Sequence, residues 1–194
     1  MDTWRIFFTG VGGQGTLLAT RILGEAAMLA DIPVVVSEIH GMAQRGGVVE
    51  SAVVMGEVQS PVISDGEVDI LLAFEPLEAL RAIRKCSARS LVICNTSPVA
   101  PFSVSSGRDQ YPEVSAMTRT ISSQVNRLIA YDARALAREA GSELSVNIVM
   151  LGTLMRHAKM PFAKEVIETV INTRIKKSFL EMNLKAFDLG FQVD

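Results

Sequence analysis

Short apolar runs that alternate with helical patterns dominate the chain as far as about residue 140. Runs such as Ile6–Phe8, Val34–Val36 and Ile70–Phe74 are nearly all apolar, which is typical of strands covered on both faces of a parallel sheet. Between them, apolar residues recur at helical spacing. The pattern predicts strands at Trp4–Thr9, Val34–Val36, Val48–Met55, Ile70–Phe74, Ser90–Cys94 and Arg127–Tyr131, and helices at 13–30, from Pro76, at 114–123 and at 133–140.

Beyond residue 140 the pattern is helical throughout. Asp132 can cap the helix at 133–140 and Gly141 ends it, and three further helices are predicted at 145–159, 162–173 and 175–189. Gly152, in the first of these, allows a close contact between helices. Strand–helix alternation followed by helices predicts an α/β fold, a single doubly wound and mostly parallel sheet with a helical C-terminal segment. At 194 residues, one domain spanning 1–194 is expected.

The first strand runs directly into a glycine turn, and an amphipathic helix follows. Gly10, Gly12 and Gly15 fit the pattern G-x-G-x-x-G, with Gly13 as an additional glycine and Gln14 between them. Glycines at these places permit a tight turn and leave the first N–H groups of the helix uncovered, which suits a phosphate or carboxylate. The alternative is a tight strand-to-helix connection that binds nothing.

A second unusual stretch follows the second strand and has neither helical nor alternating periodicity. Within it, Arg45 stands beside Gly46 and Gly47, so its guanidinium could present a fork of donors to a carboxylate or phosphate while the glycines let the backbone approach. The alternative is a solvated hairpin loop with a surface arginine. His40, at the start of this stretch, is a candidate base or a residue that makes a local hydrogen bond.

Two glutamates stand at strand ends. Glu38 follows Gly15 at about the 20-residue spacing at which a dinucleotide-binding unit holds the ribose hydroxyl. It is otherwise a solvated carboxylate, the interpretation we favour. Glu75 lies at the rim where open α/β sheets bind ligands, but it also precedes Pro76 and can cap the next helix, which we favour slightly.

Composition excludes several classes of function. The chain is 48% hydrophobic and carries a net charge of −2 with interspersed signs, so neither nucleic acid nor an anionic membrane is an expected partner. No apolar run approaches the roughly 18 residues of a membrane span, and no signal peptide is visible, so a cytoplasmic location is expected. Cys86 and Cys94 are too few to hold an iron–sulfur cluster or structural zinc, and Cys94 is expected in the core.

No catalytic apparatus is recognisable. The sequence lacks a G-x-S-x-G elbow, a Cys–His pair and an H-x-x-x-H pair, and no lysine follows Gly15 as a phosphate loop of the Walker type requires. Its histidines are His40 and His157. We therefore expect no catalytic residue and no metal site, and interpret the chain as part of a larger catalytic assembly.

Four stretches of the chain together carry a family resemblance: 10–15, 41–47, 69–75 and 147–152. With them the chain resembles the gamma-type subunit of 2-oxoacid:ferredoxin oxidoreductases, and the Gly-Met-Ala-Gln-Arg-Gly-Gly form of its second motif is most similar to the small (beta) subunit of the indolepyruvate branch. The resemblance implies one pyruvate/ketoisovalerate oxidoreductase gamma-type domain over residues 1–194.

The resemblance also implies a function and partners. The assembly would oxidatively decarboxylate indolepyruvate or another aryl pyruvate with coenzyme A, and would reduce ferredoxin. Thiamine diphosphate and the iron–sulfur clusters would lie on a large partner subunit, and this chain alone would hold no cofactor. Residues expected to meet an anionic group of coenzyme A or of the partner are Gly10, Gly12, Gly13, Gln14, Gly15, Arg45, Gly46 and Gly47.

Other interpretations lead to different expectations. A self-standing NAD(P)-binding Rossmann oxidoreductase would bind NADH alone, with Glu38 on the ribose. A nucleotide-sensing or scaffold module would have no enzyme attached. An obligate subunit, in contrast, should expose an apolar patch for its partner, and the isolated chain could form a homodimer through that surface.

Overall fold

A computed structural model describes residues 2–40, 47–58 and 60–194 of the chain. The sheet is built from β1 (Trp4–Val11), β2 (Val34–His40), β3 (Val48–Met55), β4 (Val68–Ala73), β5 (Cys86–Asn95) and β6 (Arg127–Tyr131). The predicted bounds of β3 and β6 are confirmed, and the other strands are longer or begin earlier than predicted. β5 begins as early as Cys86 because Cys86 pairs with Val68 of β4. An irregularity in the register then separates this pair from the regular pairing that starts at Ile70 and Leu91.

The helices follow the predicted order. They are α1 (Thr16–Leu29), α2 (Pro76–Ala82), α3 (Phe102–Ser105), α4 (Val114–Ser122), α5 (Ala133–Ala140), α6 (Val146–His157), α7 (Lys164–Arg174) and α8 (Lys177–Phe191), with short 3₁₀ turns at Ile83–Lys85 and Glu143–Ser145. None of the described helices is long and apolar enough to cross a membrane. The stretch from Val99 to Pro112, whose prolines and serines predict an exposed loop or flap, contains the short α3, which was not predicted, and its residues 106–110 are exposed.

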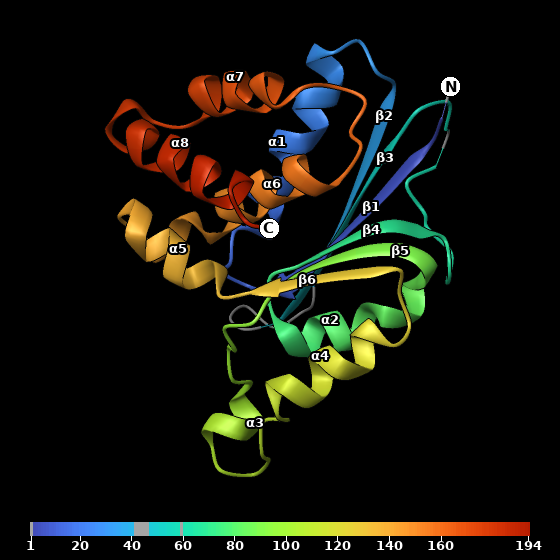
Figure 1. Cartoon of the computed structure of the whole chain (residues 1–194), viewed down its shortest axis with the longest axis vertical. Coiled ribbons are helices and arrows are strands. Elements are labelled where there is room, and N and C mark those ends of the chain that lie inside the picture. Colours follow the sequence, from blue (N-terminus) through green and yellow to red (C-terminus); the bar gives the residue numbers. More distant parts are fainter. Residues whose placement is uncertain (1, 41–46, 59) are drawn as a thin grey trace.

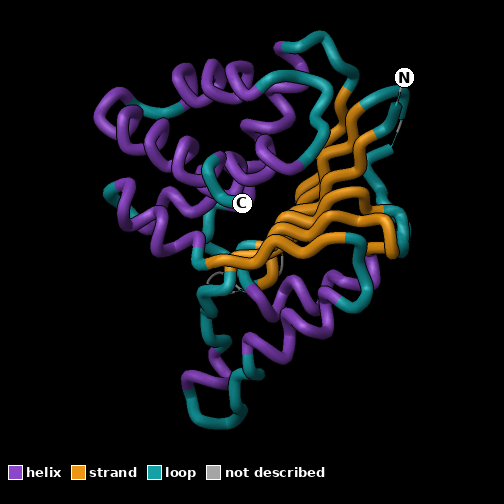
Figure 2. Tube along the Cα trace, in the orientation of Figure 1, coloured by secondary structure: helices purple, strands orange, loops and turns teal. Residues whose placement is uncertain are grey.

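The six strands form one mixed sheet in the order β2-β3-β1-β4-β5-β6 (Figure 2). β1, β4, β5 and β6 pair in parallel, whereas β3 runs antiparallel to both β1 and β2. The predicted α/β class with a mostly parallel sheet and a helical C-terminal segment is confirmed. The hydrophobic pattern did not reveal that β3 lies between β2 and β1.

Helices cover the two faces of the sheet unequally (Figure 1). On one face, α1, α5, α6, α7 and α8 pack on a large core that includes Ile6 and Phe8 of β1. On the other face, α2 and α4 pack on a smaller core that includes Phe7. Successive residues of a strand point to opposite faces, which explains why β1 is apolar almost throughout. Cys94 is fully buried in the smaller core, as predicted.

Two glycines allow α6 and α8 to pack in close contact. A Cβ atom added to Gly152 would lie 2.1 Å from the carbonyl oxygen of Phe187, and one added to Gly190 would lie 1.9 Å from that of Val149. The hydroxyl of Thr153 donates to the carbonyl oxygen of Gly190 at 2.9 Å. The close helix contact predicted at Gly152 is confirmed, and its partner is the last helix of the chain.

Candidate functional site

The glycine turn connects β1 to α1 at the carboxyl edge of the sheet. Gly10 and Val11 end β1, and Gly12, Gly13 and Gln14 form the turn before Gly15 caps α1. A Cβ atom on Gly10 would lie 2.8 Å from Oε1 of Gln14 and 3.0 Å from Cβ of Phe74. Gly10 is therefore needed for the close packing of this chain's own side chains.

Gln14 braces the turn from within. Its Oε1 accepts from the backbone N–H of Val11 at 2.9 Å, and its Nε2 donates to the carbonyl oxygen of Phe74 at 2.8 Å. The N–H of Gly12 donates to the carbonyl oxygen of Gly47 at 2.9 Å, which ties the turn to the start of β3. The structure thus brings the first motif against Gly47 of the second, and Arg45 and Gly46 lie outside the described residues.

Within the described residues, the N-terminus of α1 keeps donors that have no acceptor. Gly15 caps the helix in a left-handed conformation with φ of 75°, without a side-chain cap and with no acidic residue in the first turn. In the described part of the chain, the amides of Gly13, Thr16 and Leu17 have no acceptor. A Cβ atom on Gly13 would meet nothing within 4 Å, so the space beside the turn is open. These amides and the positive end of the helix dipole suit an anion.

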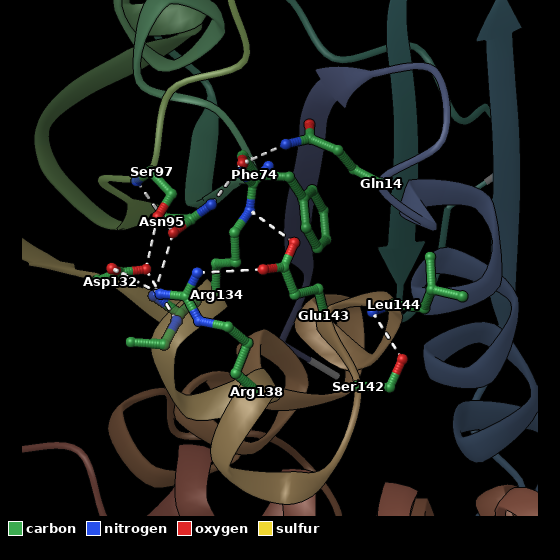
Figure 3. A network of polar contacts seen from close by, with 12 residues as sticks. Gln14, Phe74, Asn95, Ser97, Asp132, Arg134, Arg138, Ser142, Glu143 and Leu144 are labelled. Atoms are coloured by element: carbon green, nitrogen blue, oxygen red, sulfur yellow. Dashed lines mark hydrogen bonds and ion pairs between the residues drawn. The ribbon is translucent and has the colours of Figure 1, made fainter.

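A small polar pocket adjoins the turn. Its volume is about 120 Å³, and an arginine, Arg134 of α5, reaches it from the other side. The guanidinium of Arg134 lies 3.8 Å from the carboxylate of Glu143, which Arg138 also approaches at 3.1 Å (Figure 3). The lining residues are Gly13, Gln14, Asn95, Arg134, Glu143, Leu144 and Val146.

Asn95 joins three elements beneath this pocket. Its side chain is buried at the end of β5, and its Nδ2 donates to the carbonyl oxygen of Phe74 at 3.0 Å. Its Oδ1 accepts from the N–H groups of Ser97 and Ala133 at 3.2 and 3.1 Å (Figure 3). Asn95 and Gln14 therefore share one carbonyl oxygen as acceptor. The sequence signal that could have identified Asn95 is a polar residue directly after an apolar strand at the ligand-binding edge.

Asp132 begins α5 beside Asn95. Its carboxylate accepts from the N–H of Ala135 at 2.9 Å, as the predicted N-cap requires, and from the hydroxyl of Ser97 at 2.5 Å. Burial acts to raise the pKa of Asp132, but these hydrogen bonds and the charge of Arg138 together hold the pKa below its usual range. The carboxylate is thus ionised and contributes negative charge to the rim.

Glu75 caps α2, which confirms the slightly favoured of its two predicted roles. Its carboxylate is almost completely buried and accepts from the N–H groups of Leu77 and Glu78 at 2.7 and 3.0 Å. It also accepts from the N–H of Val99 at 3.2 Å and from the hydroxyl of Tyr111. Burial raises the pKa of Tyr111, and the hydrogen bond to Glu75 raises it further. Glu75 therefore fastens the segment after β5 to the protein and is not free to meet a ligand.

Glu38 does not occupy the place that the dinucleotide interpretation requires. In a dinucleotide-binding unit the first two strands are neighbours, whereas here β3 separates β2 from β1 by about 10 Å. Glu38 forms an ion pair with Arg21 of α1 at 3.3 Å. The favoured interpretation, a solvated carboxylate, is correct only in part, because the Glu38 side chain is 24% exposed and paired with Arg21. His40 is the last residue of β2, and its side chain lies outside the described part.

The remaining chemistry-bearing groups are distant from the turn or unreactive. Burial raises the pKa of the Cys86 thiol to about 11 and that of Cys94 to about 12. The ring of His157 bonds the carbonyl oxygen of Val193 at 2.9 Å. Among the described residues, no three His, Cys, Asp or Glu side chains are grouped so that they could hold a metal ion. The groups at the turn and its pocket are backbone amides, the side-chain amides of Gln14 and Asn95, and the ion pair of Arg134 with Glu143.

The fold that carries the glycine turn is a mixed α/β sheet with a helical C-terminal segment. The chain belongs to the pyruvate ferredoxin/flavodoxin oxidoreductase family, which it matches over residues 5–193. It is 42% identical over 188 residues to the indolepyruvate oxidoreductase subunit IorB of Methanothermobacter thermautotrophicus, covering 97% of this chain and 96% of that protein.

Solved structures agree with the sequence relatives. The gamma subunit of keto/oxoacid ferredoxin oxidoreductase from Geobacter sulfurreducens is 28% identical, with a TM-score of 0.71 over 97% of this chain and 96% of that one. The chain also shares its fold with part of the 2-oxoglutarate:ferredoxin oxidoreductase of Magnetococcus marinus, with 19% identity and a TM-score of 0.73 over 100% of this chain and 31% of that one. The gamma-type resemblance inferred from the motifs is confirmed.

Proposed function

We propose that this chain is the small, non-catalytic subunit of a thiamine-dependent oxidoreductase that converts indolepyruvate or another aryl pyruvate to an acyl-CoA. The substrate branch is supported by the 42% identity to a protein named as an indolepyruvate oxidoreductase subunit. Thiamine diphosphate and the iron–sulfur clusters belong to the large partner subunit, and ferredoxin receives the electrons through the complex in the cytoplasm. A single gamma-type domain over residues 1–194 is part of this proposal.

The open N-terminus of α1 carries the proposal for a binding role. Coenzyme A is rich in phosphate, and a phosphate fits a helix start whose amides lack acceptors in the described part of the chain. The related Magnetococcus marinus structure is described with coenzyme A bound. We assign the glycine turn, together with Arg45, Gly46 and Gly47, to an anionic group of coenzyme A or of the partner chain.

The chemistry at the turn is that of a binding surface. The backbone amides of Gly13 and Thr16 can donate hydrogen bonds but do not act as acids or bases at neutral pH, and the guanidinium of Arg134 is likewise a hydrogen-bond donor. This chain would hold and orient an anionic group while the partner's cofactors perform the reaction. The isolated subunit should therefore be inactive.

An exposed apolar groove supports attachment to a large partner. It has a volume of about 650 Å³ and lies beside the glycine turn, because its lining residue Asn147 donates to the carbonyl oxygen of Gly15 at 3.2 Å. Leu144 is 80% exposed and Phe179 is 53% exposed in this groove. Apolar side chains exposed together in this way are typical of surfaces that a partner covers. The lining residues include Leu18, Leu144, Ile175, Phe179 and Met182.

Co-purification from the native host tests the proposal directly. The expected result is a large subunit in stoichiometric amount, with bound thiamine diphosphate and iron. Leu144→Lys should release the partner, because it places a charge in the apolar groove. Arg45→Ala should lower the activity of the complex while the melting temperature of the isolated chain stays nearly unchanged. A chain that elutes alone and binds NADH tightly would overturn the proposal.

A further inference from the structure

β2 is an outer strand of the sheet and leaves one row of backbone groups free. The carbonyl oxygen of Pro33 accepts from the N–H of Gly56 at 2.9 Å, so the backbone groups of Pro33 face β3. In an antiparallel pair, the N–H and C=O of one residue point to the same side, and the side alternates along the strand. Val35, Ser37 and Ile39 therefore also face β3. The outward groups belong to Val34, Val36, Glu38 and His40.

β2 carries few of the devices that usually protect an edge strand. Outer strands tend to carry charged side chains, proline or a bulge, or to be covered by another segment. β2 contains no lysine or proline, its register with β3 is continuous from Val34 to His40, and its one acidic side chain, Glu38, is paired with Arg21 of α1. Within the described part of the chain, no group bonds the outward amides and carbonyls of β2. The edge can therefore accept another strand.

Apolar side chains border this edge on both faces of the sheet. Ile39 is 62% exposed and lies with Val62 around a small cavity on the face that α2 and α4 cover only farther along (Figure 1). On the opposite face, which α1 covers, Val36 of β2 is 39% exposed. A strand added at the edge would remove such apolar surface from water as well as satisfy backbone groups.

The seven residues of β2 are complementary to themselves about Ser37. Suppose that two copies pair antiparallel with a two-fold axis at Ser37. Val34 then lies opposite His40, and Val36 lies opposite Glu38. Every residue whose backbone groups point outward therefore meets another such residue. On the open face, Val35 then lies opposite Ile39 of the second copy, an apolar cross-strand pair. An axis at Val36 or Glu38 would shorten the overlap and lose hydrogen bonds.

We propose that the free edge of β2 binds β2 of a second copy of this chain, with the two-fold axis at Ser37, so that two six-stranded sheets become one. The occupant is a second copy because antiparallel pairing about Ser37 places Val35 against Ile39 twice and gives the outward backbone groups of β2 partners along its whole length. The interface shares no residue with the groove at Leu144. It therefore stands whether or not the proposed function is correct.

A pair of cysteine variants tests the register in the full chain. In this register, two Ser37 residues form a non-hydrogen-bonded pair with Cα atoms about 4.5 Å apart, a separation that a disulfide can bridge. Two Val36 residues would lie diagonally, about 7–8 Å apart, which exceeds the reach of a disulfide. Under mild oxidation, Ser37→Cys should give a covalent dimer, and Val36→Cys should remain monomeric on a non-reducing gel.

The native cysteines should not obscure this result. Burial raises the pKa of the Cys86 thiol to about 11 and that of Cys94 to about 12, so both are protonated at pH 8 and react slowly. The unmodified protein serves as the baseline. Equal cross-linking of both variants, or none of Ser37→Cys, would overturn the proposal.

Sedimentation measurements test the association without cysteine chemistry. The unmodified chain should dimerise reversibly in the micromolar range, since a single strand pair is a small interface. Ile39→Lys should weaken the dimer at least tenfold, because a lysine at the edge opposes strand addition. Leu144→Lys, an equally drastic change at an 80% exposed site, should leave it unaltered. A chain that remains monomeric, or a dimer indifferent to Ile39→Lys, contradicts the proposal.

Discussion

Two helices that start at the same edge of the sheet differ in how their first amides are satisfied. At α2, the buried carboxylate of Glu75 accepts from the N–H groups of Leu77 and Glu78. At α1, the cap is Gly15, which has no side chain, and no acidic residue follows in the first turn. One helix start carries an anion from its own chain, and the other carries none.

A third helix start strengthens the contrast. α5 follows β6 at this edge, and Asp132 accepts from the N–H of Ala135. Both α2 and α5 therefore have an internal carboxylate where the helix dipole favours negative charge. The absence of such a group at α1 leaves a place for an anion from outside the chain, on which the proposed binding role rests.

Glu75→Ala should produce the largest effect on stability. It leaves the buried amides of Leu77 and Glu78 without an acceptor and releases the hydroxyl of Tyr111. We expect a loss of about 3 kcal/mol in the free energy of unfolding, measured by urea denaturation. Glu75→Gln keeps one acceptor oxygen and should lose less. A loss below about 1 kcal/mol for Glu75→Ala would show that α2 does not depend on this cap.

Gly15→Ala should have the next largest effect, because it disturbs the start of α1 itself. The new Cβ would lie 2.6 Å from Nδ2 of Asn147 at a residue with φ of 75°. Strain and crowding together should cost about 2 kcal/mol. Gly13→Ala is the matched control, since Gly13 also has positive φ, at 99°, but open space beside it. Equal losses in the two variants would mean that the contact with Asn147 contributes nothing.

Leu18→Glu should give α1 the internal negative charge that α2 and α5 already possess. Leu18 lies in the first turn of α1 and is exposed. The carboxylate should weaken binding of coenzyme A to the complex about fivefold relative to Leu18→Gln, which removes the same apolar group without adding charge. Titration calorimetry on both variants measures the difference. Identical affinities of the two variants would show that the N-terminus of α1 does not bind coenzyme A.

Asp132→Asn should have the smallest effect, and only at acid pH. The pKa of Asp132 is lowered in the folded protein, so the unfolded state binds the proton more readily. The stability that the carboxylate contributes is present above its unfolded pKa of about 3.9 and is lost as the pH falls through the lower folded pKa. The Asp132→Asn variant still caps α5, but because it has no carboxylate to protonate, it should not show this loss of stability at acid pH. An unchanged pH profile of the melting temperature would argue against the lowered pKa.

Local signals predicted the capped and terminated elements well. The strand Arg127–Tyr131, the cap Asp132 and the helix Ala133–Ala140 with Gly141 at its end were all predicted, and the structure confirms them. In these cases the residue that signals the start or end of an element, such as Asp132 or Gly141, lies directly next to that element in the sequence. The start of α1 was predicted too early, at residue 13, because apolar periodicity does not reveal that Gly13 and Gly15 adopt positive φ and delay the helix to Thr16.

The candidate site was predicted only in the parts that lie close together in the sequence. The glycine turn was recognised from its motif, whereas Arg134 and Asn95 were missed as members of the adjoining pocket. Asn95 reaches the pocket from the end of β5 and Arg134 from the first turn of α5, which is more than half the chain away from Gly13. Spacing along the sequence carries no information about such contacts.

The sequence by itself determined the α/β class, the order of most elements, the two helix caps and the family. These depend on hydrophobic periodicity, on short-range hydrogen bonds and on motifs, all of which operate over a few residues. Only the tertiary structure decided that β3 separates β2 from β1, that Glu38 pairs with Arg21 and that β2 has a free edge. The physical reason is that apolar residues specify burial but not which strand lies alongside, so pairing is settled by the packing of the whole sheet.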